Sequence, residues 1–170
     1  TTCGYATADF DLWPETSKMI LMLLMFIGAC AGSTGGGFKI SRLLILCKAI
    51  PKQLSLVIHP REVKVIRMDG KPIDHNTLRS TNVYLAIYFF ILLISTLLVS
   101  VDNFNLTTNF TAVASALNNI GPGLDGVGPT RNFGLYSDFS KFVLMFDMLA
   151  GRLELYPLLI LFMPSLWRRK

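Results

Sequence analysis

The sequence predicts an all-α membrane protein built from helix–pore-loop–helix units, and three observations support that fold class. Hydrophobic residues make up 52% of the 170 residues and charged residues only 16%, whereas a soluble chain usually carries about 25% charged residues. The segment 80–101 contains no charged side chain, and a helix of that length, rising about 1.5 Å per residue, spans the hydrocarbon core. Two short glycine-containing strips, Thr1–Tyr5 and Asn119–Gly123, each precede a long apolar segment.

The two strips have the composition of an ion-selectivity filter. In potassium filters, short stretches rich in Thr and Gly present backbone carbonyls that replace the hydration shell of the ion. Glycine permits the backbone torsions that turn those carbonyls toward the ion. For either strip taken alone, a tight turn that happens to contain glycine is the alternative. We predict that the two strips together supply half of a potassium coordination ring, from residues Thr2, Cys3, Gly4, Tyr5, Asn119, Ile120 and Gly121.

The first strip and an outer loop occupy residues 1–13, and a broken membrane helix is predicted over 14–50. A continuous helix over 14–50 would be about 55 Å long, too long for a simple membrane span. The break falls in the stretch 28–37, and irregular backbone at membrane depth is tolerated only inside protein or beside a watery cavity. The alternative is an ordinary linker outside the membrane. We expect the stretch to obstruct the ion path as a gate, with members Gly28, Gly32, Ser33, Thr34, Gly35, Gly36 and Gly37.

The distribution of basic residues predicts the orientation of the chain in the bilayer. The net charge is +5, and most Lys and Arg side chains lie in 39–79 or at the C-terminus, whereas 102–137 contains only Arg131. By the positive-inside rule, the connector 51–79 and the C-terminus are cytoplasmic, and 102–137 faces outward or dips into the membrane. The basic residues follow the membrane boundaries and lack an aromatic stacking surface, which argues against a nucleic-acid partner.

The second half of the chain contains one complete helix–pore-loop–helix unit. A membrane helix over 80–101 is followed by a short pore helix and the second strip over 105–123, an outer loop over 124–137, and a final membrane helix over 138–167. The first strip and the broken helix correspond to the latter half of a preceding unit. The chain therefore reads as about one and a half such units and as a fragment of a longer protein.

Charged residues within the final helix indicate a role beneath the strips. Intramembrane charges cost about 2.5–3.5 kcal/mol each, so they usually face a bundle interior or water. Arg152 follows Gly121 by about the same interval that separates Gly4 from the glycine-rich stretch. We therefore expect Arg152 to lie at the depth of that stretch and to act with it as a gate. A purely structural ion pair of Arg152 with Asp147 or Glu154 is the alternative.

The sequence gives little support to an enzyme. It contains no Ser/His/Asp arrangement and no carboxylate pair spaced for acid–base catalysis. The segment Gly121–Gly126 matches the dinucleotide-binding pattern G-x-G-x-x-G literally, but it lacks the preceding strand and the following helix that this pattern requires. We predict no catalytic residue, no covalent cofactor and no metal other than transported K⁺.

Four stretches in this order resemble the potassium-translocating subunit of the Trk/Ktr/HKT superfamily, most closely its bacterial TrkH branch: Thr1–Asp9, Gly28–Ile40, Asn118–Gly123 and Asp147–Phe162. The resemblance covers nearly the whole chain as the C-terminal half of that family. It implies four helix–pore-loop–helix repeats around a pseudo-fourfold pore, with Gly4 and Gly121 as the third and fourth filter glycines. Asp125 departs from the family, in which glycine is frequent at this position.

The same resemblance implies gated potassium uptake, by symport or through a channel, across a bacterial inner membrane. Its implied partners are the missing N-terminal half of the same protein, a second copy in a homodimer, and a cytoplasmic nucleotide-binding ring of the TrkA type. The stretch 28–37 would be the intramembrane gating loop of the third repeat, and Arg152 the arginine below the filter in the fourth. A non-transporting membrane assembly or anchor subunit that retains pore-like sequence is the alternative function.

Overall fold

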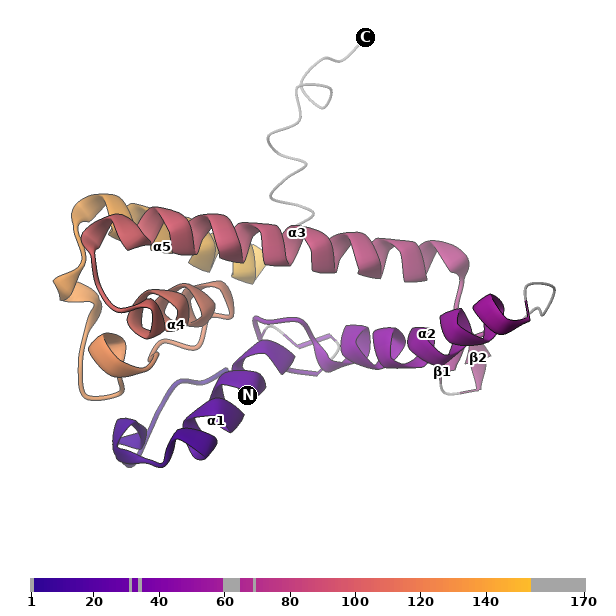
Figure 1. Ribbon diagram of the computed structural model, residues 1–170, viewed down its shortest axis with the longest axis horizontal. Helices are drawn as coiled ribbons and strands as arrows, with labels where there is room; N and C mark the ends of the chain where they lie inside the picture. The colour runs from indigo at the N-terminus through magenta and orange to yellow at the C-terminus, as the bar shows by residue number, and fades with distance from the viewer. Residues whose placement is uncertain (1, 31, 34, 60–64, 69, 154–170) are drawn as a thin grey trace, which may run out of the picture.

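A computed structural model describes residues 2–30, 32–33, 35–59, 65–68 and 70–153 of the chain. The described part is mainly helical, as Figure 1 shows, and includes one short antiparallel hairpin. Its principal elements are α1 (Glu15–Ile27), α2 (Ile40–Ile58), β1 (Arg67–Met68), β2 (Lys71–Pro72), α3 (His75–Val99), α4 (Leu106–Leu117) and α5 (Asp138–Leu153). Residues 154–170, which include Glu154 and the predicted end of the last helix at 167, lie outside the described residues.

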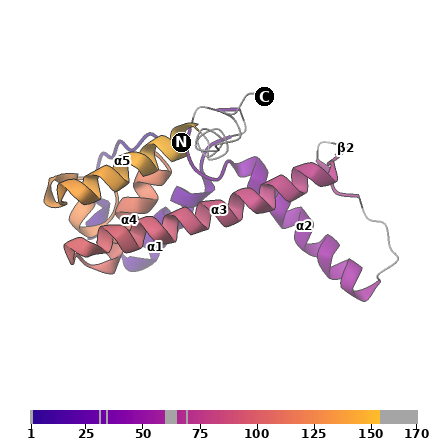
Figure 2. The same ribbon diagram turned by 90° about the horizontal axis from the view of Figure 1, so that it is seen from above.

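The short helix α4 lies at the centre of the packed helices. It contacts α3, α5 and α1, and α3 and α5 also contact each other. Figure 1 shows α3 and α5 along one side of α4 and α1 on its other side, and in Figure 2, seen from above, α4 lies between α5 and α3. Residues 111–118 are all buried, including the small side chains of Ala112, Ala114 and Ala116. Small side chains allow the surrounding helices to approach closely.

Helix α3 has many of its apolar side chains facing outward and several of its polar side chains facing inward. Phe90, Leu93 and Leu97 are exposed, whereas Ser95 and Thr96 are buried. This arrangement is the reverse of that in a soluble protein, and it fits a helix whose outer face is solvated by lipid. In the described part of the chain, α3 is the one helix that is long and apolar enough to cross a membrane, with the candidate span Asn76–Asp102.

The predicted break between two apolar helices is present, and it extends from Gly28 to Lys39. Two backbone hydrogen bonds close the returning chain onto the end of α1: Phe38 N donates to Phe26 O (3.2 Å), and Ile40 N donates to Ala29 O (3.1 Å). The Phe38 side chain is buried and its ring packs near Tyr84 and Tyr88 of α3. These contacts attach the break to the core of the molecule.

Helix α2 continues to Ile58, past the predicted boundary at Ile50, because a proline is accommodated within it. Pro51 removes one backbone hydrogen bond of the helix. Ile45 and Ala49, six and two residues before the proline, are buried with Ile66 and Leu78 in a separate small core, and this packing holds the helix against the hairpin. The hairpin pairs Met68 with Lys71 around Gly70.

Candidate functional site

The two glycine strips, far apart in the sequence, are in direct contact. A Cβ built at Gly4 would lie 2.9 Å from the carbonyl carbon of Ile120, closer still to its oxygen, and 3.1 Å from Cδ of Pro122. The backbone of Gly4 thus touches the backbone of the second strip, and any side chain at this position would push the strips apart.

Both strips share an alternating backbone pattern. In the first strip φ is positive at Thr2 (55°) and Gly4 (77°); in the second it is positive at Asn119 (53°) and Gly121 (110°). An extended strand directs successive carbonyls to opposite sides. Left-handed torsions at every second residue rotate the intervening peptide planes, so that successive carbonyls can face one side. Positive φ is rare for a β-branched residue such as Thr, so the torsion of Thr2 could not be expected from its residue type.

The amides of the second strip donate hydrogen bonds away from the strip. Ile120 N donates to Ser115 O (3.0 Å), and Gly121 N donates to Ser115 Oγ (3.1 Å). Slightly further along, Leu124 N donates to Thr111 Oγ1 (3.0 Å). Ser115 and Thr111 both belong to the buried helix α4, which therefore fixes the strip from behind. The sequence-based assignment did not identify these two hydroxyl groups.

Asn118 joins the second strip to the glycine-rich loop and to α3. Its Oδ1 accepts a hydrogen bond from the Tyr88 hydroxyl (2.8 Å), and its Nδ2 donates to Ala114 O (2.8 Å). A Cβ at Gly36 would lie 2.7 Å from the carbonyl carbon of Asn118, and one at Gly37 would lie 3.3 Å from Oδ1. Asn118 is not among the residues predicted for the site. Its side chain is completely buried, and these contacts make it a structural centre of the site.

The loop lies against the first strip as well as the second. A Cβ at Gly35 would lie 3.1 Å from Oγ1 of Thr2. Gly28 and Gly37, at the two ends of the loop, face each other closely, because a Cβ at Gly37 would lie 2.8 Å from Cα of Gly28. The loop is therefore a closed turn against the strips. Gly32 and Ser33 lie away from this contact, and Thr34 lies outside the described residues.

Arg152 and the loop line one cavity of about 160 Å³. The cavity also receives Arg42, whose guanidinium carbon lies 3.9 Å from the centre of the Tyr84 ring, in the geometry of a cation–π contact. The structure thus brings Arg152 and the glycine-rich loop, which we expect to act together, to the walls of the same cavity. The described residues that line the cavity are Ser33, Gly35, Gly37, Lys39, Arg42, Tyr84, Gly151 and Arg152.

Asp147 does not pair with Arg152, so this form of the structural alternative is wrong. The Asp147 side chain is completely buried; its Oδ1 accepts a hydrogen bond from Ser95 Oγ (2.7 Å), and its Oδ2 has no hydrogen-bond partner among the described residues. Residues 147 and 152 are five apart, a spacing that separates side chains around a helix. The other alternative, a pair with Glu154, lies outside the described residues.

Gly151 allows α5 to touch the base of the second strip. A Cβ at this position would lie 2.8 Å from the carbonyl carbon of Leu117 and 2.7 Å from Nδ2 of Asn119. Asn119 Nδ2 in turn donates a hydrogen bond to Met148 O of α5 (3.0 Å). The residue next to Arg152 thus sets the distance between α5 and the strip.

At the outer end, Asp125 is fixed by two polar side chains of the α4 region. Its Oδ2 accepts hydrogen bonds from Asn105 Nδ2 (3.2 Å) and Thr108 Oγ1 (3.0 Å). These bonds, that of Asn105 first, hold the pKa of the Asp125 carboxyl below its ordinary value, because they favour the charged form. Asp125 has φ of 56°, a left-handed torsion that glycine adopts more readily than a residue with a Cβ.

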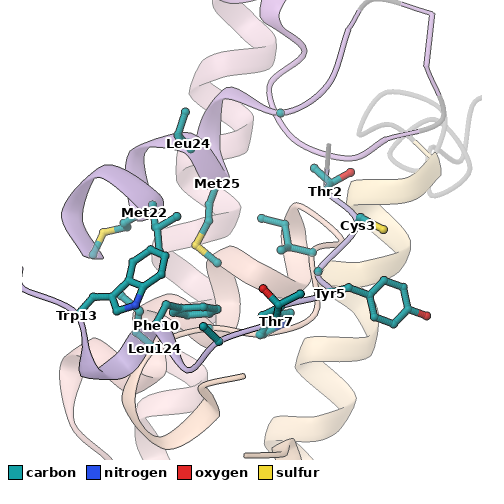
Figure 3. A pocket seen from close by; sticks show the side chains of 18 residues that line it. Thr2, Cys3, Tyr5, Thr7, Phe10, Trp13, Met22, Leu24, Met25 and Leu124 are labelled. Atoms are coloured by element: carbon teal, nitrogen blue, oxygen red, sulfur yellow. The ribbon is translucent and has the colours of Figure 1, made fainter. Parts of the chain in front are cut away.

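A larger pocket of about 400 Å³ lies between the first strip and α1. Figure 3 shows Phe10, Trp13, Met22 and Met25 gathered on one side of it, while Tyr5 points away from them. A dehydrated cation requires a shell of oxygen ligands, which these side chains do not provide. The same pocket is also lined by the first strip and by Ile120 of the second strip, so this apolar wall faces the backbone that we predict to coordinate the ion.

The described residues contain no group of three or more His, Cys, Asp or Glu side chains placed to hold a metal ion. The chemical groups that the site offers are backbone carbonyls in two adjoining strips, a closely packed glycine loop, and the cationic side chains around the cavity. With α3 as an apolar candidate span, the fold is that of part of an α-helical membrane protein.

The chain belongs to the TrkH family: the family model described as "Cation transport protein" matches residues 1–169. It is 38% identical to the Trk system potassium uptake protein TrkH of Vibrio parahaemolyticus, covering 99% of this chain and 34% of that protein. It is 35% identical to TrkI of Halomonas elongata, covering 99% of this chain and 35% of that protein. It is 33% identical to TrkG of Escherichia coli, covering 99% and 34%.

A solved structure, described as the potassium transporter TrkH from Vibrio parahaemolyticus, matches the fold with a TM-score of 0.88 at 38% sequence identity. The match covers 99% of this chain and 36% of that chain. The chain therefore spans about a third of the length of these relatives, less than the half that the sequence resemblance suggested.

Proposed function

We propose that this chain forms part of a potassium uptake pore in a bacterial inner membrane, and that its two strips are two of the four sides of the selectivity filter. The observation that carries the proposal is the contact of Gly4 with Ile120 between two strips that share the same alternating positive φ. The matched relatives are named potassium uptake proteins. Because they are uptake proteins, the alternative of a non-transporting anchor subunit gains no support.

In the proposed filter, backbone carbonyls of Thr2, Cys3, Gly4 and Tyr5 face the ion from one side. Those of Asn119, Ile120 and Gly121 face it from the adjoining side. The amides behind the second strip are already bonded to Ser115, so its carbonyls are held by the scaffold and need little rearrangement when the ion arrives. Carbonyls held in place can replace the water shell of a dehydrated K⁺. The other half of the coordination ring would come from the rest of the protein.

In the proposed gate, the loop 28–37 obstructs the path beneath the filter and Arg152 adds an electrostatic barrier. The loop packs on Thr2 and Asn118 at the base of the strips, and Arg152 shares a cavity with it. A unit positive charge about 8 Å from a potassium ion raises its energy by about 2 kcal/mol at an effective dielectric constant of about 20. Opening would then require the loop to move and the ion to be shielded from this charge.

The proposed assembly follows the family resemblance and the charge distribution. The missing part of the protein would complete the pore, two copies would associate as a homodimer, and a TrkA-like nucleotide-binding ring would bind on the cytoplasmic side. The basic residues of 39–79 place that segment in the cytoplasm by the positive-inside rule. The chain would then cross the membrane several times, with its C-terminus in the cytoplasm.

Ion flux through the full-length protein tests the function. The protein is reconstituted into liposomes, and K⁺ efflux is measured with and without Arg152→Gln; Lys141→Gln, at the outer end of α5, is the control because it removes a cation outside the cavity. We expect wild-type flux above that of protein-free liposomes and a rise of about tenfold or more for Arg152→Gln, the change expected for a barrier of about 2 kcal/mol. No flux from correctly folded wild-type protein would refute potassium transport. Unchanged flux per molecule in Arg152→Gln would refute the barrier alone.

A further inference from the structure

The outer loops that follow the two strips are joined by the carboxylate of Asp11. Its Oδ1 accepts a hydrogen bond of 3.0 Å from the backbone N–H of Asp125, 114 residues further along the chain. A Cβ built at Gly128 would lie 2.9 Å from Cγ of Asp11, and closer still to Oδ2. The carboxylate therefore fits between two points of the loop that follows the second strip, and the absence of a side chain at Gly128 makes the room.

Both ends of this link are fixed to their own surroundings. Asp11 N donates a hydrogen bond of 3.1 Å to Oδ1 of Asp9, which shapes the turn that presents the carboxylate. On the other side, the Asp125 side chain is held by Asn105 and Thr108. A displacement of Asp11 is therefore transmitted to the outer end of the second strip.

The Asp11 link is the shorter of two hydrogen bonds that join the described residues of these loops; the other runs from Thr130 Oγ1 to Oδ2 of Asp9 over 3.4 Å. Near the middle, Gly4 meets Ile120 through backbone surfaces, and such a contact resists approach but not sliding or separation. A hydrogen bond from an amide to a carboxylate is both directional and strong. Selectivity among monovalent cations depends on the position and number of the carbonyls around the ion, so the spacing of the strips affects it.

We propose that Asp11 is a positioning residue for ion selectivity: by clasping the backbone at Asp125 and Gly128, its carboxylate fixes the separation of the two strips. This inference rests on the proposed function, because it assumes that the strips form the filter. Asp11 itself does not contact the ion in this proposal. It acts through the loop that follows the second strip.

The K⁺/Na⁺ permeability ratio of the full-length protein in liposomes tests the link. Asp11→Ala removes the acceptor, and Gly128→Ala displaces it by adding a methyl group where the carboxylate lies. We expect each to lower the ratio about tenfold, the change that corresponds to one charge-assisted hydrogen bond. Asp11→Asn retains an acceptor oxygen and should stay within about twofold of wild type. The control Asp138→Ala removes an exposed carboxylate that pairs with Lys141 and should leave the ratio unchanged.

The double variant distinguishes this link from general damage to the outer loop. Without the carboxylate, the added methyl group has nothing to displace, so Gly128→Ala should have little further effect in the Asp11→Ala background. The proposal would be overturned if Asp11→Ala and Gly128→Ala lowered the K⁺/Na⁺ permeability ratio equally and independently, or if Asp11→Ala kept the wild-type ratio. Should Asp11→Ala fail to fold, the pair Asp11→Asn and Gly128→Ala decides, because only the second should lose selectivity.

Failure of the proposed function is recognised separately. If the wild-type protein shows no K⁺ flux, the filter assignment fails, and the same variants are then compared by melting temperature. The Asp11 link still requires that the destabilisation by Asp11→Ala and Gly128→Ala be non-additive. Additive melting-temperature losses would overturn the link itself.

Discussion

Replacing Gly4 with alanine should disrupt the filter through one added methyl group. The Cβ would lie 2.9 Å from the carbonyl carbon of Ile120 and closer to its oxygen, whereas carbon atoms in ordinary contact are about 3.5–4.0 Å apart. Relief requires the strips to separate by about 1 Å. The clash involves backbone on both sides, so no flexible side chain can move to absorb it.

The same substitution also imposes backbone strain, which a matched control removes. Gly4 has φ of 77° and Gly70 has φ of 78°, and a left-handed torsion costs a residue with a Cβ about 1–2 kcal/mol. At Gly70, in the hairpin turn, an added Cβ meets no described atom within 4 Å. Gly70→Ala therefore reports the strain alone, and Gly4→Ala reports strain and clash together.

The assay is growth of potassium-uptake-deficient bacteria on limiting K⁺, with Rb⁺ influx measured in the same cells and normalised to membrane-inserted protein. We expect Gly4→Ala to reduce influx per molecule at least about tenfold, which corresponds to about 1.4 kcal/mol. Gly70→Ala should retain wild-type influx, with at most a small loss of protein. Wild-type influx in Gly4→Ala would show that the strips do not form a close-fitting coordination ring.

Two further predictions concern the supports of the second strip. Tyr88→Phe leaves the buried Oδ1 of Asn118 without its donor and should lower the free energy of unfolding by about 1–3 kcal/mol. Denaturation in detergent measures this free energy. Tyr5→Phe alters an exposed ring and is the control; an equal loss in this variant would contradict the reasoning. The lowered pKa of Asp125 means that its contribution to stability is fully present above the ordinary carboxyl pKa of about 4 and is lost as the pH falls through the lower folded value. Below about pH 4, the melting temperature of Asp125→Asn should therefore depend less on pH than that of the wild type, and the same should hold for Asn105→Ala. A wild-type pH dependence in both variants would contradict this prediction.

The sequence was sufficient to predict features that depend on local pattern. The uncharged run of 80–101, the glycine-rich break after α1, and the short helix before the second strip are each visible in composition and spacing. The end of α2 was not predictable in the same way, because Pro51 usually terminates a helix. Here the packing of Ile45 and Ala49 against the hairpin region overrides that local preference.

The site residues that the sequence did not reveal act through long-range contacts. Asn118 looks like an ordinary residue at a helix end until Tyr88 and the glycine loop are placed around it. Asp11 looks like a surface carboxylate until Asp125, 114 residues away, is brought to it. A single sequence carries no signal for such pairings, since nothing in local periodicity encodes which distant backbone amide a side chain meets.

Because Gly151 contacts the base of the second strip directly, a movement of α5 is transmitted to that strip. At Gly151 no side chain lies between the backbone of α5 and Leu117. A tilt of α5 therefore displaces the backbone of the strip directly. Arg152 is the next residue of α5 and moves with this helix. In the proposed pore, a displacement of α5 would therefore move the Arg152 barrier and the second strip together.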